Sequence, residues 1–376
     1  MLSKEKQIKR VVIKIGSSSL TSMHGEISRR KLEKFAEQIV ELKDAGYETA
    51  VVSSGAVAAG YRKLGCLDRP SSLPEKQAAA SIGQGLLMES YSELFLSHGY
   101  VASQILITRS DFSDEKRYGN MHNTMNVLLE RGIIPIINEN DTVTVDRLRF
   151  GDNDTLAAKV AGLIDADLLI ILSDIDGLYD SNPNDNPGAS LLERVHSITP
   201  EIEAAAGGSG SAVGTGGMKS KIQAVKIAMA AGIDSFLGKA GTEHILMEAV
   251  EGRAKGTYFN PEPDAFNLDN QKQWIAFHSG PEGKVTISSH GIEAIVDHQE
   301  NLYCSDIQEV KGRFKDGAVV RILDEEGKEI GLGRINYSNE QLGNKLGNHT
   351  AGEELEPAIA QETFVCSRDF KLPALV

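Results

Sequence analysis

The sequence predicts an α/β fold in which an open, mostly parallel sheet is sandwiched by helices, followed by a small β-rich domain. Three observations support this prediction. Short runs of apolar, β-branched residues alternate with helical patterns through the first two-thirds of the chain. These runs are apolar at nearly every position, as is typical of parallel strands buried on both faces. The alternation stops near residue 255, and only short strand-like segments separated by turns follow.

The elements of the first region follow from periodicity and from capping residues. In the first helix Leu32, Phe35, Ile39 and Leu42 recur at helical spacing, after a possible cap at Ser28 and before Gly46. Further helices are expected directly after residue 55 and at residues 75–97, 116–131, 154–163 and 218–231. Strands are expected at residues 11–15, 49–52, 101–107, 133–137, 168–172 and 235–237. In such a sheet, ligands bind at the carboxyl ends of the strands.

The second region is expected to be a separate domain. Residues 260–270 (NPEPDAFNLDN) are rich in Pro, Asp and Asn and lack periodicity, which is typical of a linker. The predicted domains are therefore residues 1–258 and 281–376, joined by a linker at 259–280. Within the second domain, strands are expected at residues 284–287, 292–296, 318–323 and 330–335.

Composition excludes several classes of protein. The 376 residues carry a formal net charge of −14, which argues against a general binder of nucleic acids or anionic membranes. The three cysteines are widely spaced and form no CxxC pair, as expected in a reducing compartment. No apolar run approaches membrane-spanning length and no signal-peptide pattern begins the chain. We therefore expect a cytoplasmic protein.

The segment 208–221 (GSGSAVGTGGMKSK) is the most informative motif, because glycines and serines run into a predicted helix at Lys219 and Lys221. Backbone N–H groups of such a loop can approach phosphate oxygens, and a helix N-terminus favours anions. Met218 follows Gly217, so the segment is not a Walker A loop. Taken alone, it is equally typical of a flexible surface linker.

A second glycine- and serine-rich turn follows Lys14, which lies in a strand and precedes Gly16. Ser53, Ser54 and Gly55 end the next strand, where a helix cap and a ligand-binding turn are both consistent with the residues. The nine histidines are scattered without metal-ligand spacing, which argues against a protein metal site and against nucleophilic catalysis.

Polar clusters also follow the later strands and precede a helix. Asn138–Glu139–Asn140–Asp141 follows a buried strand and could bind an ammonium and a carboxylate, although turn chemistry alone could explain it. Gly151–Asp152–Asn153–Asp154 leads into a helix and contains more polar groups than a cap requires. Ser173 and Asp174 end another strand.

In this order, the clusters resemble the glutamate 5-kinases of the amino acid kinase superfamily. The resemblance spans residues 10–255 and is carried by VVIKIGSSSLT, VVSSGAVAAG, PIINENDTV, FGDNDTLAA, LSDIDGLY and GTGGMKSK. It implies ATP- and Mg²⁺-dependent phosphorylation of the side-chain carboxylate of L-glutamate, the first step of proline biosynthesis. A carboxylate is already ionised at pH 7, so this reaction needs charge neutralisation but no general base.

The resemblance also implies roles for individual residues. Lys14 and Lys221 would flank the transferring phosphoryl group, and Asp154 would hold both lysines. Ser54, Asn138, Asp141 and Asn153 would bind glutamate. ATP would contact Lys14, Gly16, Ser173, Asp174, Thr215, Gly216, Gly217, Met218, Lys219, Ser220 and Lys221. Lys219 would be a helper or a bystander, and Mg²⁺ would be carried with ATP rather than bound by protein side chains alone.

The C-terminal region resembles a PUA domain, a small β-barrel-like module, through residues 310–314 and 316–320. Residues 282–371 contain 10 Lys and Arg against 17 Asp and Glu, a net charge of 10 − 17 = −7, which argues against RNA binding. The family resemblance further implies feedback inhibition by proline, homo-oligomers, and functional coupling to glutamyl-5-phosphate reductase.

Two alternative functions remain open from the sequence. One is a kinase of the same superfamily acting on acetylglutamate, aspartate, carbamate or a nucleoside monophosphate. An acetylated amine could not pair with an anionic Asp141, whereas a free ammonium could. The other is an RNA-binding protein in which the kinase fold is a remnant, which predicts salt-dependent RNA affinity.

Overall fold

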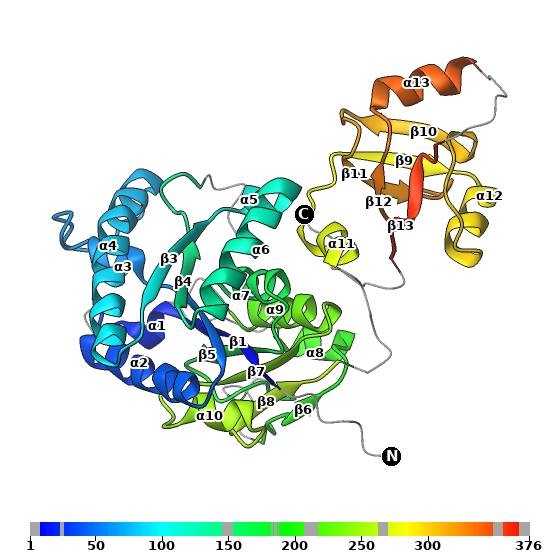
Figure 1. Ribbon diagram of the computed structural model, residues 1–376. Coiled ribbons are helices and arrows are strands. Elements are labelled where there is room, and N and C mark those ends of the chain that lie inside the picture. Colours follow the sequence, from blue (N-terminus) through cyan, green and yellow to red (C-terminus); the bar gives the residue numbers. More distant parts are fainter. Residues whose placement is uncertain are drawn as a thin grey trace. The chain divides into compact units, whose positions relative to one another are not determined.

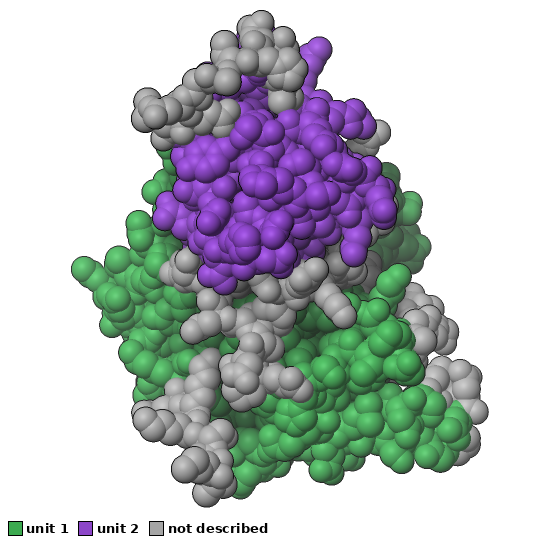
Figure 2. All heavy atoms as spheres, turned by 90° about the vertical axis from the view of Figure 1, so that its right-hand side faces the viewer, with its two compact units in different colours: residues 1–111, 116–263 green, residues 112–115, 264–376 purple. Residues whose placement is uncertain are grey.

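The computed structural model describes residues 8–22, 26–144, 153–181, 183, 186, 188–206, 217–261, 270–348 and 356–367. The predicted contacts Thr215 and Gly216 lie outside these residues. The chain divides into two compact units, coloured separately in Figure 2. Unit 1 comprises Met1–Asp111 and Lys116–Pro263, and unit 2 comprises Phe112–Glu115 and Asp264–Val376.

Unit 1 is built on an eight-stranded sheet with the strand order β3-β4-β2-β1-β5-β7-β8-β6. All neighbouring pairs are parallel except β7 and β8, so the predicted mostly parallel sheet is confirmed. The strands are β1 (Arg10–Ile15), β2 (Glu48–Ser53), β3 (Ala102–Ile107), β4 (Ile134–Glu139), β5 (Leu168–Ser173), β6 (Arg194–Val195), β7 (Asp234–Lys239) and β8 (Gly256–Phe259). The short strands β6 and β8 were not expected.

Helices cover both faces of this sheet (Figure 1). They are α1 (Ser17–Leu20), α2 (Arg29–Asp44), α3 (Ala56–Gly60), α4 (Leu73–Ser97), α7 (Asn153–Leu163), α8 (Pro200–Ala206), α9 (Met218–Ala230) and α10 (Ile245–Val250). Two further helices, α5 (Arg109–Ser113) and α6 (Glu115–Glu130), contribute residues to both units.

Strand β1 lies at the centre of the sheet, and its residues alternate between the two faces. Val11, Ile13 and Ile15 are fully buried and pack in one cluster with apolar residues of α2, α4 and α10. Because successive side chains of a strand point to opposite faces, Lys14 points toward the other face. Figure 1 shows α7 and α9 on that face. A lysine between fully buried apolar neighbours is thus directed toward the helices α7 and α9.

Unit 2 contains a five-stranded sheet with the order β10-β9-β11-β12-β13. Its strands are β9 (Gly283–Ile287), β10 (Ile307–Gly312), β11 (Val319–Leu323), β12 (Glu329–Ile335) and β13 (Ile359–Cys366). Its helices are α11 (Asn270–Gln273), α12 (Ser289–Ile292) and α13 (Asn339–Asn348). Residues 270–278, expected in the linker, form α11 and a π-helical turn, and the Trp274 indole donates to the Phe112 carbonyl at 2.9 Å.

One predicted strand of unit 2 is wrong. Residues 292–296 continue α12 into a π-helical turn at Glu293–Asp297. The helix is initiated by Ser288, whose Oγ accepts a hydrogen bond from the Gly291 N–H at 3.1 Å. Ile292, Ile295 and Val296 recur at helical spacing, and the short apolar run therefore suited a helix as well as a strand.

Helices long and apolar enough to cross a bilayer do not occur among the residues that the structure describes.

Candidate active site

Three charged side chains meet on the face of the sheet covered by α7 and α9. Lys14 comes from β1, Asp154 from the first turn of α7, and Lys221 from the first turn of α9. Lys14 Nζ lies 2.5 Å from Asp154 Oδ1, and Lys221 Nζ lies 3.2 Å from Asp154 Oδ2. Asp154 is fully buried, and both lysines are 6% exposed. We call these three residues the lysine–aspartate cluster, and it unites the predicted catalytic residues.

The environment of Asp154 stabilises its ionised form. Burial alone would raise the pKa of this carboxyl, but the charges of Lys14 and Lys221 outweigh that effect and hold the pKa below its usual value. Ser220 Oγ lies 3.0 Å from Asp154 Oδ2 and 2.8 Å from the Gly217 carbonyl, two acceptors for its single proton. Two ammonium groups against one carboxylate leave one positive charge in excess, which suits an anionic ligand.

The backbone at Gly16 passes close to the ammonium group of Lys14. A Cβ atom placed on Gly16 would lie 3.4 Å from Lys14 Nζ, at van der Waals contact with the ammonium group. Gly16 precedes α1, so the expected glycine- and serine-rich turn is partly helical.

A second, uncharged group of predicted residues lies at the carboxyl ends of β2 and β4 and at the start of α7. Asn153 Nδ2 lies 2.9 Å from Ser54 Oγ, 3.1 Å from the Ser53 carbonyl and 3.1 Å from Asn138 Oδ1. Asn138 is 4% exposed. We call Ser54, Asn138 and Asn153 the amide cluster. It adjoins the lysine–aspartate cluster, because Asn153 and Asp154 are consecutive.

The backbone beside the amide cluster depends on one glycine. Gly55, directly after Ser54, has a φ of 110°, a left-handed conformation that residues with a side chain rarely adopt. A Cβ atom at this position would also lie 2.9 Å from Ile27 Cδ1. Asp141, the fourth predicted glutamate-binding residue, is half-buried in the turn after β4, where its N–H donates to the Glu139 carbonyl.

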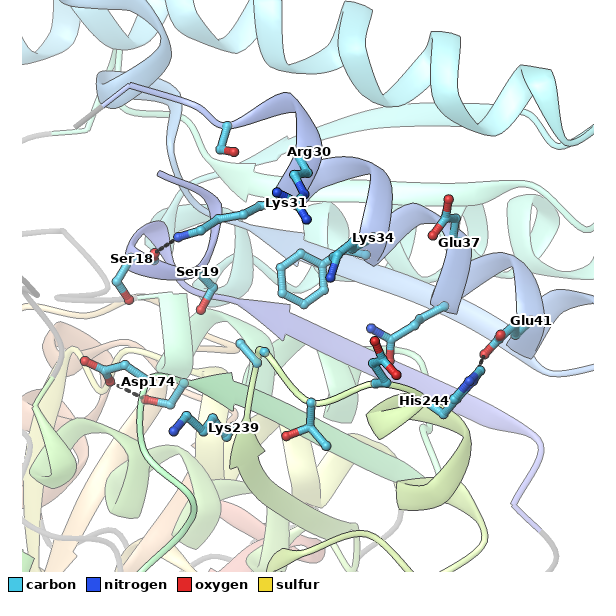
Figure 3. Close-up of a pocket in the computed structure, with 18 residues that line it drawn as sticks. Ser18, Ser19, Arg30, Lys31, Lys34, Glu37, Glu41, Asp174, Lys239 and His244 are labelled. Atoms are coloured by element: carbon cyan, nitrogen blue, oxygen red, sulfur yellow. Dashed lines mark hydrogen bonds and ion pairs between the residues drawn. The ribbon is translucent and has the colours of Figure 1, made fainter. Parts of the chain in front are cut away.

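The predicted nucleotide contacts are Ser173, the last residue of β5, and Asp174, which follows it, and both line a cavity of about 850 Å³ (Figure 3). Lys31, Lys34 and Lys239 also line it. Lys31 Nζ donates to the Ser18 carbonyl at 3.3 Å, as drawn in Figure 3. A cavity of this size is in the range of small-molecule sites. The lysine–aspartate cluster does not line it.

The remaining predicted contacts belong to α9. Met218 is the first residue of the helix, and Gly217 precedes it as the capping residue. Lys221 is buried, whereas Lys219 is exposed. The two lysines, two residues apart, therefore face different surroundings, as expected if Lys219 is a bystander.

Two buried residues of α4 that the sequence analysis did not single out support the amide cluster. Tyr91 is fully buried, and its hydroxyl lies 2.9 Å from Ser53 Oγ. Burial raises the Tyr91 pKa to about 12, which keeps the phenol protonated. Gln84 Oε1 accepts a hydrogen bond from Asn138 Nδ2 at 3.0 Å. The only signal in the sequence is a glutamine between two glycines, Gly83 and Gly85, within a predicted helix.

Protein ligands for a metal do not gather in the described residues, where groups of three or more His, Cys, Asp or Glu side chains with suitable geometry are absent.

Comparison with known proteins identifies the family and the fold of the chain. The model of the amino acid kinase family matches residues 9–239, more than half of the chain, and the model of the PUA domain matches residues 283–351. Carbamate kinase from Giardia lamblia bound to AMP-PNP has the same fold, with a TM-score of 0.51 at 18% identity over 68% of this chain and 99% of that one. The chain belongs to the amino acid kinase family.

Curated relatives refine this assignment. The chain is 64% identical to Glutamate 5-kinase 2 of Bacillus licheniformis, over 97% of this chain and 98% of the relative. It is also 64% identical to Glutamate 5-kinase 2 of Bacillus subtilis, over 99% of this chain and 100% of the relative. Glutamate 5-kinase of Citrifermentans bemidjiense is 44% identical, over 93% of this chain and 92% of the relative. Within the amino acid kinase family, the chain belongs to the glutamate 5-kinases.

Proposed function

We propose that the chain transfers the terminal phosphoryl group of ATP to the side-chain carboxylate of L-glutamate. The product is L-glutamyl 5-phosphate, and the reaction is the first step of proline biosynthesis. Membership of the glutamate 5-kinases supports the overall reaction. The observation that carries the catalytic assignment is the lysine–aspartate cluster, in which two buried ammonium groups share one buried carboxylate.

The lysine–aspartate cluster suits phosphoryl transfer to a weak nucleophile. Glutamate's side chain is ionised at pH 7 and needs no general base. The barrier is lowered when fixed cations offset the negative charge that spreads over the transferring group. Lys14 and Lys221 are the catalytic lysines of this proposal. Asp154 is a positioning residue, because it holds both ammonium groups without contacting the reacting atoms.

Glutamate binding is assigned to the amide cluster together with Asp141. Ser54, Asn138 and Asn153 supply hydroxyl and amide groups next to the lysine–aspartate cluster. Asp141 supplies an anionic group for the ammonium of the free amino acid. An N-acetylated amine would bring no positive charge to Asp141, which favours glutamate over acetylglutamate as the acceptor.

ATP binding is assigned to the backbone at Gly16, to Ser173 and Asp174, and to the segment from Thr215 to Lys221. The N-terminus of α9, a helix of 13 residues, favours phosphate through its unpaired N–H groups and its dipole. Mg²⁺ is expected to be carried by the phosphate oxygens of ATP. Its role is to neutralise charge on the phosphates.

Proline inhibition is a further part of the proposal. Proline shares the α-ammonium and α-carboxylate of glutamate and would compete for the amide cluster and Asp141. A proline titration at several glutamate concentrations tests this idea. Competitive kinetics are expected, and strictly noncompetitive kinetics would rule out a shared pocket. We also expect a cytoplasmic homo-oligomer coupled to glutamyl-5-phosphate reductase, and a structural or regulatory PUA domain that does not bind RNA.

The decisive experiment is an ADP-release assay with ATP, Mg²⁺ and a panel of acceptors. Glutamate is expected to support turnover, whereas acetylglutamate, aspartate, carbamate and UMP are not. The chemical identity of the product can be checked by trapping the acyl phosphate with hydroxylamine. Absence of glutamate-dependent ADP release would refute the proposed function. Salt-dependent binding of RNA by the full chain would contradict the role given to the PUA domain.

A further inference from the structure

Gln84 places an unsatisfied hydrogen-bond donor beside the amide cluster. The residue lies on α4 and is 7% exposed. Its Nε2 atom is buried and has no hydrogen-bond partner among the residues that the structure describes. Buried amide groups are normally paired, because leaving a donor without a partner sacrifices the hydrogen bonds it made to water. A buried donor of this kind next to a binding site points to a ligand.

The orientation of the Gln84 amide follows from its neighbours. The backbone N–H of Glu139 can only donate, and it donates to Asn138 Oδ1 at 2.9 Å. This contact fixes which end of the Asn138 amide is oxygen, so Nδ2 is the end that reaches Gln84. Gln84 must therefore accept through Oε1. Its two Nε2–H donors remain for a ligand.

Helix α4 is held firmly at this point by contacts with α3. A Cβ atom on Gly83 would lie 1.8 Å from the Ala56 carbonyl oxygen, and one on Gly60 would lie 1.9 Å from the Ala79 carbonyl oxygen. The two helices therefore touch through their backbones. Two helical turns further along α4, Tyr91 contacts Ser53 at the end of β2. The Gln84 amide thus has a fixed position relative to β2 and β4.

We propose that Gln84 Nε2 donates a hydrogen bond to the α-carboxylate of L-glutamate. Glutamate offers one ammonium and two carboxylates, and only a carboxylate can accept from Nε2. The side-chain carboxylate must lie at the lysine–aspartate cluster to react. Gln84 is hydrogen-bonded to Asn138, which is hydrogen-bonded in turn to Asn153, the neighbour of Asp154, so the Gln84 amide joins the site two hydrogen-bonded residues away from Asn153 rather than at Asp154 itself. The inference rests on the proposed placement of glutamate at the amide cluster.

Two substitutions separate substrate binding from support of Asn138. Gln84→Glu keeps an acceptor for Asn138 Nδ2 but replaces the donor with an anion that repels a carboxylate. Gln84→Met keeps the length of the side chain and loses both functions. If Gln84 binds the substrate, Gln84→Glu should raise KM for glutamate at least as much as Gln84→Met, by about 10- to 100-fold. The change in kcat should stay within about threefold, because the contact is made equally in ground and transition states.

A purely supporting role for Gln84 predicts the opposite order. Gln84→Glu would then keep a KM close to that of the unsubstituted chain, and Gln84→Met would show the larger defect. That order would overturn the proposal. Thermal unfolding shows whether both variants fold. If Gln84→Met does not fold, Gln84→Glu alone is the test. An unchanged KM for glutamate in Gln84→Glu would then contradict the proposal.

The end of glutamate that Gln84 contacts is tested with truncated substrates. 4-Aminobutyrate lacks the α-carboxylate, and glutarate lacks the ammonium. With 4-aminobutyrate, measured as a substrate or as a competitive inhibitor, Gln84→Met should change the affinity by less than about threefold. With glutarate, Gln84→Met should lose affinity by about the same factor as with glutamate. An equal loss with 4-aminobutyrate and glutamate would overturn the assignment to the α-carboxylate. Failure of the chain to phosphorylate glutamate at all would refute the proposed function instead.

Discussion

The lysine–aspartate cluster and the amide cluster meet at two consecutive residues, Asn153 and Asp154, yet they are built from opposite kinds of interaction. The first is a buried ion triad with one positive charge in excess. The second is an uncharged network of hydrogen bonds with directional donors and acceptors. Charge acts on a developing anion over several ångströms, whereas an amide recognises only a group at the correct position. The first should therefore govern turnover, and the second should govern affinity for glutamate.

The largest effect is expected from removing one of the two buried cations. Lys221→Ala should lower kcat by about 10²- to 10³-fold, because one of two groups that offset the transferring charge is lost. KM for glutamate should change by less than about threefold. Lys219→Ala is the matched control, since Lys219 lies on the same helix but is exposed, and it should keep kcat within about twofold. Comparable losses in both variants would contradict the distinction between the two lysines.

Removing the shared anion should damage stability as well as turnover. Asp154→Asn leaves two ammonium groups buried without their carboxylate, and breaking such an arrangement costs about 3–5 kcal/mol. Urea unfolding at pH 7 measures this difference, with kcat measured in parallel. A variant as stable as the unsubstituted chain would show that water already screens the cluster.

Asp154 also predicts how stability depends on pH. Since the folded-state pKa of this carboxyl is lowered, the unfolded chain takes up the proton first as the pH falls. The contribution of Asp154 is therefore complete above the pKa of the unfolded carboxyl, about 3.9, and is lost as the pH falls through the folded-state pKa. The acid side of the stability profile should be less steep in Asp154→Asn. Profiles of equal steepness would contradict the ion triad.

The amide cluster should respond in KM rather than in kcat. Asn153→Leu removes the group that contacts Ser53, Ser54 and Asn138, and it should raise KM for glutamate by about 10- to 100-fold. The change in kcat should be smaller than in Lys221→Ala. Initial rates over a range of glutamate concentrations separate the two constants. A large fall in kcat at unchanged KM would contradict the assignment of turnover to the lysine–aspartate cluster and of glutamate affinity to the amide cluster.

The sequence was sufficient to predict the parallel sheet and the members of both clusters. Lys14 stands out as a charge in an apolar strand, and Asn153 and Asp154 stand out as surplus polar residues at a helix start. Strand order brings their elements together, because β1 lies between β2 and β5 in the sheet. Local sequence could not predict Gln84 or Tyr91, since their importance depends on how α4 packs against α3 and β2.

The misassigned segment at residues 292–296 has a different cause. Four apolar residues within five suit a short strand or a helical turn, and periodicity alone does not separate the two. The cap formed by Ser288 decided the outcome, and a hydroxyl residue before an apolar run was the available signal. For short apolar runs, the capping residues at the ends distinguish a helix from a strand better than the spacing of the apolar residues does.

The smallest effect should come from the packing that positions the amide cluster. Gly83→Ala places a methyl group 1.8 Å from the Ala56 carbonyl oxygen, so α3 and α4 must separate, at a cost of about 1–3 kcal/mol. KM for glutamate should rise, because Gln84 moves with α4. The rise should be smaller than in Asn153→Leu, because no side chain of the amide cluster is removed. Gly85→Ala is the control, since no atom lies within 4 Å of its added Cβ. Alanine there should stabilise the helix by about 0.5–1 kcal/mol and leave KM unchanged. Equal stabilities of the two variants would contradict the close backbone contact between α3 and α4, and an unchanged KM in Gly83→Ala would show that this contact does not position the amide cluster.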